Sequence, residues 1–379
     1  MTRTLQDLET PCAVLDETRM QRNIDRLRAR LDDLGVRLRP HLKTTKSVAA
    51  ARRVMPTPQG PAMVSTVKEI EQFFAAGVTD ITYGVGIEPA KLERIVEFRR
   101  RSADVAVILD SLEQARLVAA VARRSGDVIP AFIELDVDDH RSGVKPHDAD
   151  GLCAIAALLA DGAALRGVLT HAGESYFCHG KQALIEHAEL KRSGAVTAAE
   201  HLRAGGFACP EVSVGATPTA HFARDLTGVT EVRAGVYVFF DLVMAGIGVC
   251  QLDDIALTVM TTVIGHQEDK GWIITDGGWM AMSRDRGTAA QPVDQGYGIV
   301  CDMDGRPYPD LIVSGANQEH CIISVRAGCD AALPDLSLGD RLRILPNHAC
   351  ATAAQHDRYH VVQDGSNTLT GEWPRFYAW

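Results

Sequence analysis

The feature that most constrains the fold is a regular alternation of short apolar runs with segments of helical periodicity. Between the runs lie segments with apolar residues at helical spacing, such as 20–34, 69–76, 92–98 and 112–122. Strand–helix alternation predicts a parallel sheet, and eight repeats predict closure into a (β/α)₈ barrel of the TIM type over residues 1–245. The expected strands are Val36–Pro40, Ala62–Val64, Ile81–Tyr83, Ala106–Leu109, Ala131–Leu135, Gly167–Thr170, Val212–Val214 and Glu231–Val238.

The texture of the sequence changes near Gly246-Ile247-Gly248, after which short β-rich runs are separated by turn residues and few helices fit. This pattern predicts a second, mainly antiparallel β domain over residues 246–379. The early run Pro11–Leu15 is compatible with either domain, so the first 15 residues or so could pack with the β domain. The expected β-domain strands are Ile255–Ile264, Trp272–Thr275, Leu311–Val313, Ile322–Val325, Arg341–Leu345 and Tyr359–Val362.

Composition excludes several classes of protein. A formal net charge of −10 argues against a nucleic-acid partner, because phosphate binding needs a basic face. No apolar run reaches the roughly 18 residues that a membrane span needs, and the amino terminus lacks a signal-peptide stretch, so we expect a cytoplasmic protein without membrane contact. Nine cysteines without a C-x-x-C pair argue against a disulfide framework and a structural zinc cluster.

Polar residues that follow the predicted strands are the first candidates for a site, because barrel enzymes carry their sites at the carboxyl ends of the strands. His41, Lys43 and Lys46 follow the first strand. A desolvated lysine in this position can form an imine with an aldehyde, although most loop lysines are simply solvated.

Three further strand ends carry candidates. Arg141 follows the fifth strand and could hold a phenolate or carboxylate oxygen, or instead pair with one of three nearby aspartates. His171 follows the sixth strand and could stack on a planar cofactor or be an ordinary core histidine. The seventh strand leads into Ser213, Gly215 and Thr217, small residues that could cradle a phosphate.

In the β domain, His348 and Cys350 lie two residues apart, so on an extended segment they would project from one face. Imidazole and thiolate together suit zinc, and two protein ligands would leave positions for water or substrate. The alternative is a buried cysteine beside an unrelated histidine. Gln318 and His320 could line the same cleft and meet the substrate.

Taken together, these residues resemble the fold-type III pyridoxal-phosphate enzymes, the alanine racemase-like barrels, and within them the D-serine dehydratase and D-threonine aldolase group. The resemblance covers nearly the whole chain. It rests on Arg-Pro-His-Leu-Lys at 39–43, His-Arg-Ser-Gly-Val at 140–144, Gly-Ala-Asn-Gln-Glu-His at 315–320, Pro-Asn-His-Ala-Cys at 346–350, and the stretches 230–244 and 279–288.

This resemblance implies pyridoxal 5'-phosphate and a divalent metal as cofactors, the metal being zinc or, alternatively, manganese. Lys43 would be the imine-forming lysine, and His348 and Cys350 the metal ligands. The remaining cofactor contacts would be Arg141 at the phenolic oxygen, His171 against the pyridine ring with Tyr176 beside it, Ser213, Gly215 and Thr217 at the phosphate, Gly235 and Tyr237 on its other side, and Arg233 at the ring nitrogen.

The implied activity is a lyase that eliminates water from a D-3-hydroxy amino acid, D-serine or D-threo-3-hydroxyaspartate, to give a 2-oxo acid and ammonia. The aldolases of the group typically have aspartate as the second metal ligand, so Cys350 favours the dehydratases. Retro-aldol cleavage to glycine and an aldehyde, racemisation, and non-catalytic binding of the cofactor are the alternatives. Relatives usually form dimers, so a homodimer is expected.

Overall fold

The computed structural model describes residues 3–139 and 141–377, which fall into two compact units. The barrel unit comprises Arg26–Gly235, and the β unit comprises the residues up to Asp25 together with Val236–Tyr377. The expected boundary in the sequence was 245/246, whereas the chain passes from the barrel unit to the β unit between Gly235 and Val236. No helix within the described ranges combines the length and the apolar character that a bilayer crossing requires.

The barrel unit contains eight parallel strands in the order β2-β9-β8-β7-β6-β5-β4-β3, and a bridge between His41 and Met63 brings the first strand beside the last. All eight expected strands are present, so the predicted (β/α)₈ barrel is confirmed. The strands are β2 (Arg37–Pro40), β3 (Ala62–Val64), β4 (Asp80–Gly86), β5 (Asp104–Leu109), β6 (Pro130–Leu135), β7 (Ala164–His171), β8 (Glu211–Gly215) and β9 (Glu231–Ala234).

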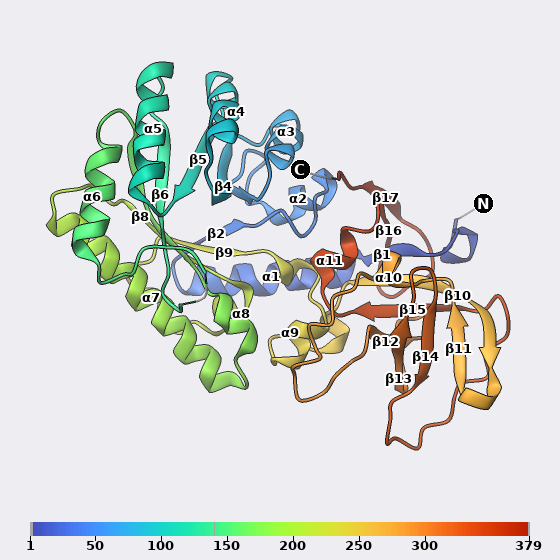
Figure 1. Ribbon diagram of the computed structural model, residues 1–379. Coiled ribbons are helices and arrows are strands. Elements are labelled where there is room, and N and C mark those ends of the chain that lie inside the picture. The colour runs from blue at the N-terminus through green and yellow to red at the C-terminus, as the bar shows by residue number, and fades with distance from the viewer. Residues whose placement is uncertain (1–2, 140, 378–379) are drawn as a thin grey trace. The chain divides into compact units, whose positions relative to one another are not determined.

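Helices lie between successive strands and cover the outside of the barrel (Figure 1). Several begin at a residue whose side chain accepts a hydrogen bond from the first turn, such as Thr66, Ser111 and Asp148. They are α1 (Glu17–Asp33), which leads in from the β unit, and α2 (Val48–Val54), α3 (Val67–Ala75), α4 (Pro89–Arg100), α5 (Leu112–Ser125), α6 (Ala149–Leu159), α7 (Lys181–Ala204) and α8 (Thr217–Phe222).

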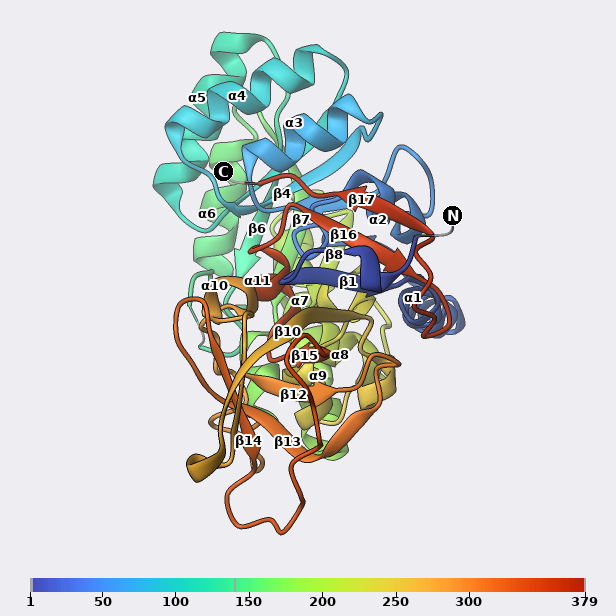
Figure 2. The ribbon, with the colours of Figure 1, turned by 90° about the vertical axis from the view of Figure 1, so that its right-hand side faces the viewer.

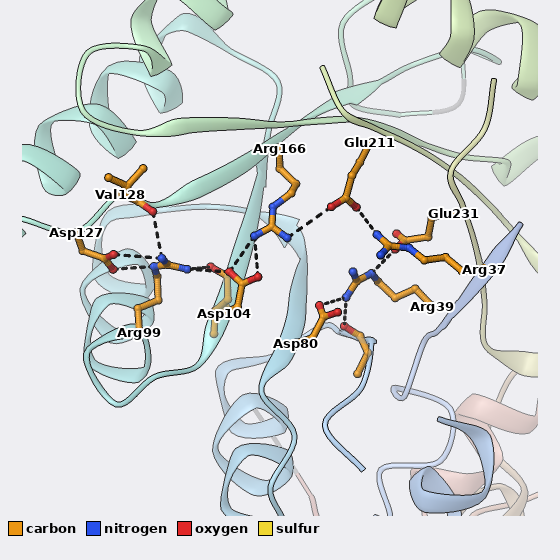
Figure 3. A network of polar contacts seen from close by, with 12 residues as sticks. Arg37, Arg39, Asp80, Arg99, Asp104, Asp127, Val128, Arg166, Glu211 and Glu231 are labelled. Atoms are coloured by element: carbon orange, nitrogen blue, oxygen red, sulfur yellow. Dashed lines mark hydrogen bonds and ion pairs between the residues drawn. The ribbon is translucent and has the colours of Figure 1, made fainter. Parts of the chain in front are cut away.

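A belt of ion pairs lies at the amino-terminal end of the barrel, around the first residues of several strands (Figure 3). Glu231, the first residue of β9, accepts from Arg39 at 2.7 Å and lies 3.1 Å from Arg37. Arg39 is 1% exposed and also bonds Asp80 at 2.6 Å. The belt continues through Arg37–Glu211, Arg166–Glu211, Arg166–Asp104, Arg99–Asp104 and Arg99–Asp127. These ion pairs therefore link neighbouring strands at the amino-terminal end of the barrel, opposite the end where the candidate residues lie.

The eighth strand is shorter than expected. It was predicted to run to Val238 but ends at Ala234, because the chain then turns into a short 3-10 helix, η3 (Val236–Val238). The N–H of Phe240 donates to the carbonyl of Val236 at 2.7 Å, a local bond that an extended strand does not make.

The β unit is built on a nine-stranded sheet in the order β11-β14-β13-β12-β15-β10-β1-β16-β17, and β11 also pairs with β10. All pairings are antiparallel except that of β1 with β16, which confirms the mainly antiparallel domain. Its strands are β1 (Cys12–Asp16), β10 (Leu257–Gln267), β11 (Trp272–Thr275), β12 (Gly298–Cys301), β13 (Pro307–Ala316), β14 (Cys321–Val325), β15 (Arg341–Pro346), β16 (Arg358–Val362) and β17 (Gly371–Pro374).

Strand β1 lies between β10 and β16, so the early run at Pro11–Leu15 belongs to this sheet (Figure 2). Strand β10 changes partner along its length: Leu257–Met260 pairs with β1, and Val263–Gln267 pairs with β11 across a bulge between Val263 and Gly265. The sheet therefore curls into a ring of β10, β11, β14, β13, β12 and β15 around an apolar core that includes Val259, Val300 and Ile344. Three short helices complete the unit: α9 (Leu242–Gly246), α10 (Trp279–Met282) and α11 (Ala349–Ala353).

Candidate functional site

The turn that carries Lys43 follows β2 and is held by the strands on both sides. The N–H of His41 donates to Ala234 at 2.7 Å, and the N–H of Leu42 donates to Met63 at 2.9 Å. A Cβ at Gly235 would lie 3.1 Å from the carbonyl oxygen of His41, so a glycine lets the end of β9 approach this turn. The backbone under Lys43 is thereby fixed at the carboxyl end of the barrel.

The two lysines of this turn differ in their surroundings. The ammonium of Lys46 lies 3.3 Å from the carboxylate of Glu69, which is fully buried. Lys43 is exposed, and its ammonium forms no ion pair within the described ranges. Lys43 is therefore the lysine available to react with a carbonyl compound.

Two histidines face this cationic end of the barrel. Burial lowers the pKa of His41 well below its ordinary value, and the charges of Lys43 and Arg233 lower it further. Burial also lowers the pKa of His171, helped by Arg141 and Lys43. Both imidazoles are consequently neutral near pH 7. An anionic ligand at this end of the barrel would be attracted by the lysine and arginine side chains.

Tyr176 lies in the 3-10 segment η2 (Gly173–Phe177), which begins two residues after His171. The centroids of the two rings are 6.4 Å apart, and the ring planes are inclined at 41°. The two aromatic side chains expected at the cofactor ring are thus brought together.

Arg141 is 55% exposed, and its guanidinium lies 3.5 Å from the carboxylate of Glu134. The expected alternative was an ion pair with a nearby aspartate, but those aspartates have other partners. Lys145 binds Asp136 and Asp139, and Lys191 binds Asp138. The long contact to Glu134 leaves the N–H groups of Arg141 open to a ligand.

Asp138 is a residue that sequence reasoning missed. Its side chain is 4% exposed, lies 2.7 Å from the ammonium of Lys191 in an ion pair, and accepts a hydrogen bond from the N–H of Glu174 at 3.0 Å. The segment that carries Arg141 is thereby tied to α7 and to the segment that carries Tyr176.

Ser213 and Arg233 form a buried polar column above the ion-pair belt. The hydroxyl of Ser213 donates to Glu231 at 2.7 Å and accepts from Arg233 at 2.6 Å, while Arg233 also donates to the carbonyl of Thr170 at 2.7 Å. Burial lowers the pKa of Arg233 to about 10, so it keeps its charge at neutral pH. The Ser213 hydroxyl is occupied by these bonds, and its place in the structure is to hold Arg233.

Thr217 meets a requirement of a phosphate site. It is 1% exposed, and its hydroxyl has no hydrogen-bond partner among the described residues. A buried hydroxyl without a partner is costly, and a phosphate oxygen would satisfy it. Gly215 precedes it at the end of β8, where a Cβ would lie 2.9 Å from the carbonyl of Arg233. These residues, with Lys43, fit pyridoxal phosphate.

The candidate metal ligands lie at the start of α11 in the β unit. The expectation of one extended segment is wrong, because only His348 is extended and Cys350 already lies in the helix. The side chains meet nevertheless. Burial would lower the pKa of His348, but hydrogen bonds to Asp285 and Cys350 outweigh burial and raise it to about 11.

Two carboxylates support this pair, and neither was identified from the sequence. The carboxylate of Asp285 lies 2.7 Å from Nδ1 of His348, which leaves Nε2 as the nitrogen for a metal. Asp241 is 1% exposed and accepts hydrogen bonds from the N–H groups of Met244 and Ala349. It therefore fixes the start of both α9 and α11.

The donor set of His348 and Cys350, with Asp285 behind the imidazole, fits a zinc ion that keeps open positions. Across residues 3–139 and 141–377, no three or more His, Cys, Asp or Glu side chains form a complete metal cage. All nine cysteines are free thiols, as expected, and five of them are buried.

The remaining candidates lie in the β unit. Gln318 and His320 are exposed on the turn between β13 and β14, where the N–H of Asn317 donates to the carbonyl of His320 at 2.8 Å. Tyr237 lies in η3 and is fully buried.

Comparison with known proteins agrees with this architecture. The family described as "Alanine racemase, N-terminal domain" matches residues 15–243, and the family described as "Putative serine dehydratase domain" matches residues 256–362. D-threo-3-hydroxyaspartate dehydratase of Delftia sp. (strain HT23) is 54% identical, with 100% of both chains covered. D-serine dehydratase of Dictyostelium discoideum is 26% identical over 96% of each chain. D-threonine aldolase of Arthrobacter sp is 30% identical over 95% of this chain and 91% of its own.

A similar solved structure is a cysteine-to-alanine mutant of D-threo-3-hydroxyaspartate dehydratase in the metal-free form, with a TM-score of 0.96, 53% identity and complete coverage of both chains. The chain therefore belongs to the enzyme family in which an alanine racemase N-terminal domain is followed by a serine dehydratase domain.

Proposed function

We propose that this protein is a pyridoxal-phosphate- and zinc-dependent lyase that eliminates water from D-threo-3-hydroxyaspartate, giving a 2-oxo acid and ammonia. The observation that carries the proposal is the contact between His348 and Cys350, backed by Asp285. It occurs in a chain that is 54% identical to D-threo-3-hydroxyaspartate dehydratase over its whole length. A relative with a cysteine replaced is metal-free, which supports Cys350 as a ligand.

When bound, pyridoxal phosphate would supply the acceptor for the electron pair released at Cα, and zinc would supply the Lewis acid for the β-hydroxyl. Lys43 is the base that takes the Cα proton, since it alone of the two lysines in its turn has no carboxylate partner. His41 and His171 are neutral, so neither is an imidazolium that could return the proton to Cα. The hydroxide that leaves Cβ and the proton taken from Cα together make one water, and hydrolysis of the resulting enamine consumes one water and releases ammonia.

The remaining side chains bind and orient. Thr217 and the backbone beside Gly215 hold the phosphate, Arg141 the phenolic oxygen, and Arg233 the ring nitrogen. Ser213 and Glu231 keep Arg233 in place, and Asp138 keeps the segment of Arg141 in place. Gln318 and His320 stay candidates for substrate contact.

The test is to incubate the protein, loaded with pyridoxal phosphate and zinc, separately with D-threo-3-hydroxyaspartate, D-serine and D-threonine. Oxo acid, ammonia, glycine and aldehyde are assayed together. We expect equal amounts of oxo acid and ammonia, lost on chelation. Glycine with an aldehyde would replace the dehydratase by an aldolase, and no product from any substrate would refute the proposal.

Matched variants assign the roles. Lys43→Ala should abolish turnover and the visible absorption of the bound cofactor, whereas Lys46→Ala removes a lysine of the same turn and should retain both. Cys350→Ala should lose zinc and turnover but keep the cofactor absorption. A Lys43→Ala protein that still produces oxo acid would show that the proton acceptor is another group.

A further inference from the structure

Arg284 adjoins the candidate metal ligands through its neighbour Asp285. The carboxylate of Asp285 lies 2.7 Å from Nδ1 of His348, and its carbonyl oxygen accepts a hydrogen bond from Nδ2 of Asn347 at 3.2 Å. The residue that follows Arg284 is thus bound to the segment that carries His348.

The charge of Arg284 is open to a ligand. Arg284 is exposed, and among the residues that the structure describes it forms no ion pair; its guanidinium instead lies 5.1 Å from the ring centroid of Trp279. Arg286 in the same segment is engaged, since it binds Asp294 at 2.7 Å and lies over the ring of Tyr297. Of these two arginines, only Arg284 has an uncompensated charge.

The platform under Arg284 is fixed. Trp279 begins α10, and its N–H donates to the carbonyl of Asn317 at 2.9 Å, while the N–H of Met280 donates to Gln318 at 3.1 Å. A cation–π contact holds a guanidinium by its face and leaves the N–H edge for a carboxylate. Arg284 is therefore placed to bind a carboxylate with two parallel hydrogen bonds.

The proposed substrate carries a carboxylate in the corresponding place. In D-threo-3-hydroxyaspartate, Cβ bears both the hydroxyl that leaves and a second carboxylate, whereas in D-serine that carboxylate is a hydrogen. Groups that bind the hydroxyl at His348 and Cys350 must therefore bring the β-carboxylate into the same neighbourhood.

We propose that Arg284 is a specificity-determining residue that binds the β-carboxylate, so that the site prefers a D-3-hydroxy dicarboxylate to D-serine. This inference rests on the function proposed above. It adds to that function the side chain that binds the second carboxylate of the substrate.

The test compares the holoenzyme with Arg284→Met, which keeps the apolar stem, Arg284→Lys, which keeps the charge, and the control Arg306→Met, whose side chain is 79% exposed. The readout is the ratio of kcat/KM for D-threo-3-hydroxyaspartate to kcat/KM for D-serine. In Arg284→Met this ratio should fall by about 100-fold, chiefly through KM for the dicarboxylate. Arg284→Lys should give an intermediate ratio, and Arg306→Met the wild-type ratio.

A second measurement does not depend on turnover. Malate has a hydroxyl and two carboxylates but no amine, so its binding to each protein is followed by calorimetry. Binding should weaken at least about tenfold in Arg284→Met, the loss expected for a charge-assisted bond. An equal fall for both substrates, or unchanged malate binding, would overturn the role of Arg284.

The two proposals fail differently. A wild-type protein that makes no oxo acid would refute the proposed function, and the malate measurement would still decide whether Arg284 binds a carboxylate. A wild-type dehydratase whose preference survives in Arg284→Met would leave the function standing and refute the inference.

Discussion

Glu231 is the carboxylate on which the interior of the barrel depends most, and Glu231→Gln tests this. Glu231 is 1% exposed and faces Arg39 and Ser213 at 2.7 Å and Arg37 at 3.1 Å. Without the charge of Glu231, the carboxylate left to the buried Arg39 among the described residues is that of Asp80, whose side chain is 38% exposed. The variant would leave a buried cation poorly compensated.

The expected loss follows from burial. Removing one partner of a buried ion pair costs about 3–5 kcal/mol, and because glutamine keeps the shape and one acceptor oxygen we expect about 3 kcal/mol. The control is Asp161→Asn, which breaks the exposed pair with Arg123, where the side chains are 72% and 48% exposed. Exposed pairs contribute less than about 1 kcal/mol.

Urea unfolding followed by two probes measures the effect on each unit. Far-ultraviolet circular dichroism reports mainly the long helices around the barrel. Tryptophan fluorescence is the second probe, because all four tryptophans, at 272, 279, 373 and 379, follow the barrel in sequence. With a slope of about 3 kcal/mol per molar urea, the dichroism midpoint should fall by roughly 1 M.

The pH dependence gives a further check on this variant. Burial alone would raise the pKa of Glu231, but Arg39, Ser213 and Arg37 outweigh burial and hold it below its ordinary value. The stability contributed by its charge is present above the unfolded-state pKa of about 4.3 and is lost as pH falls through the folded-state value. The reasoning is refuted if Glu231→Gln costs no more than Asp161→Asn at pH 7.

Three further perturbations test other parts of the structure. Asp285→Asn removes the acceptor behind His348 and should weaken zinc binding about 10- to 100-fold in competition with a chelator; unchanged affinity would exclude its supporting role. Burial lowers the pKa of His356 to about 4, so between pH 6.5 and 4 the unfolded chain binds a proton that the folded chain does not, and stability falls as pH drops through this window. His356→Gln should flatten that dependence in denaturation curves, and an unchanged slope would contradict the assignment. Thr217→Val removes an unpartnered buried hydroxyl, so the cofactor-free protein should be at least as stable while cofactor dissociation rises about tenfold; a less stable cofactor-free protein would show that the hydroxyl serves the fold.

The sequence predicted the barrel well because each strand is a short apolar run and most helices show helical periodicity, and both patterns are local. It predicted the antiparallel domain less completely. Strand β12 was missed because its four residues are all buried and show no alternation, and β17 because Gly371 and Pro374 are typical of turns. The end of β9 was placed too late because the run through Val238 stays apolar beyond the turn at Gly235.

The candidate site divides in the same way. Lys43, His348 and Cys350 stand in short motifs, and the resemblance identified them. Asp285 was not identified as the partner of His348, because the two residues are 63 positions apart. The bonds of Asp138 to Lys191 and of Glu231 to Arg39 also join distant parts of the chain. Local pattern gives the reactive groups, whereas the groups that orient them depend on the tertiary fold.

The closure of the barrel has a consequence for motion. Seven joints between neighbouring strands are ladders, whereas in the part of the chain that the structure describes the backbones of β2 and β3 are joined at the bridge of His41 with Met63 and by the bond from Leu42. Amide hydrogens at this joint have the fewest neighbouring bonds to break before they exchange with solvent. The joint with the fewest backbone hydrogen bonds thus lies beside Lys43, and we expect the amides there to exchange with solvent before those of the seven laddered joints.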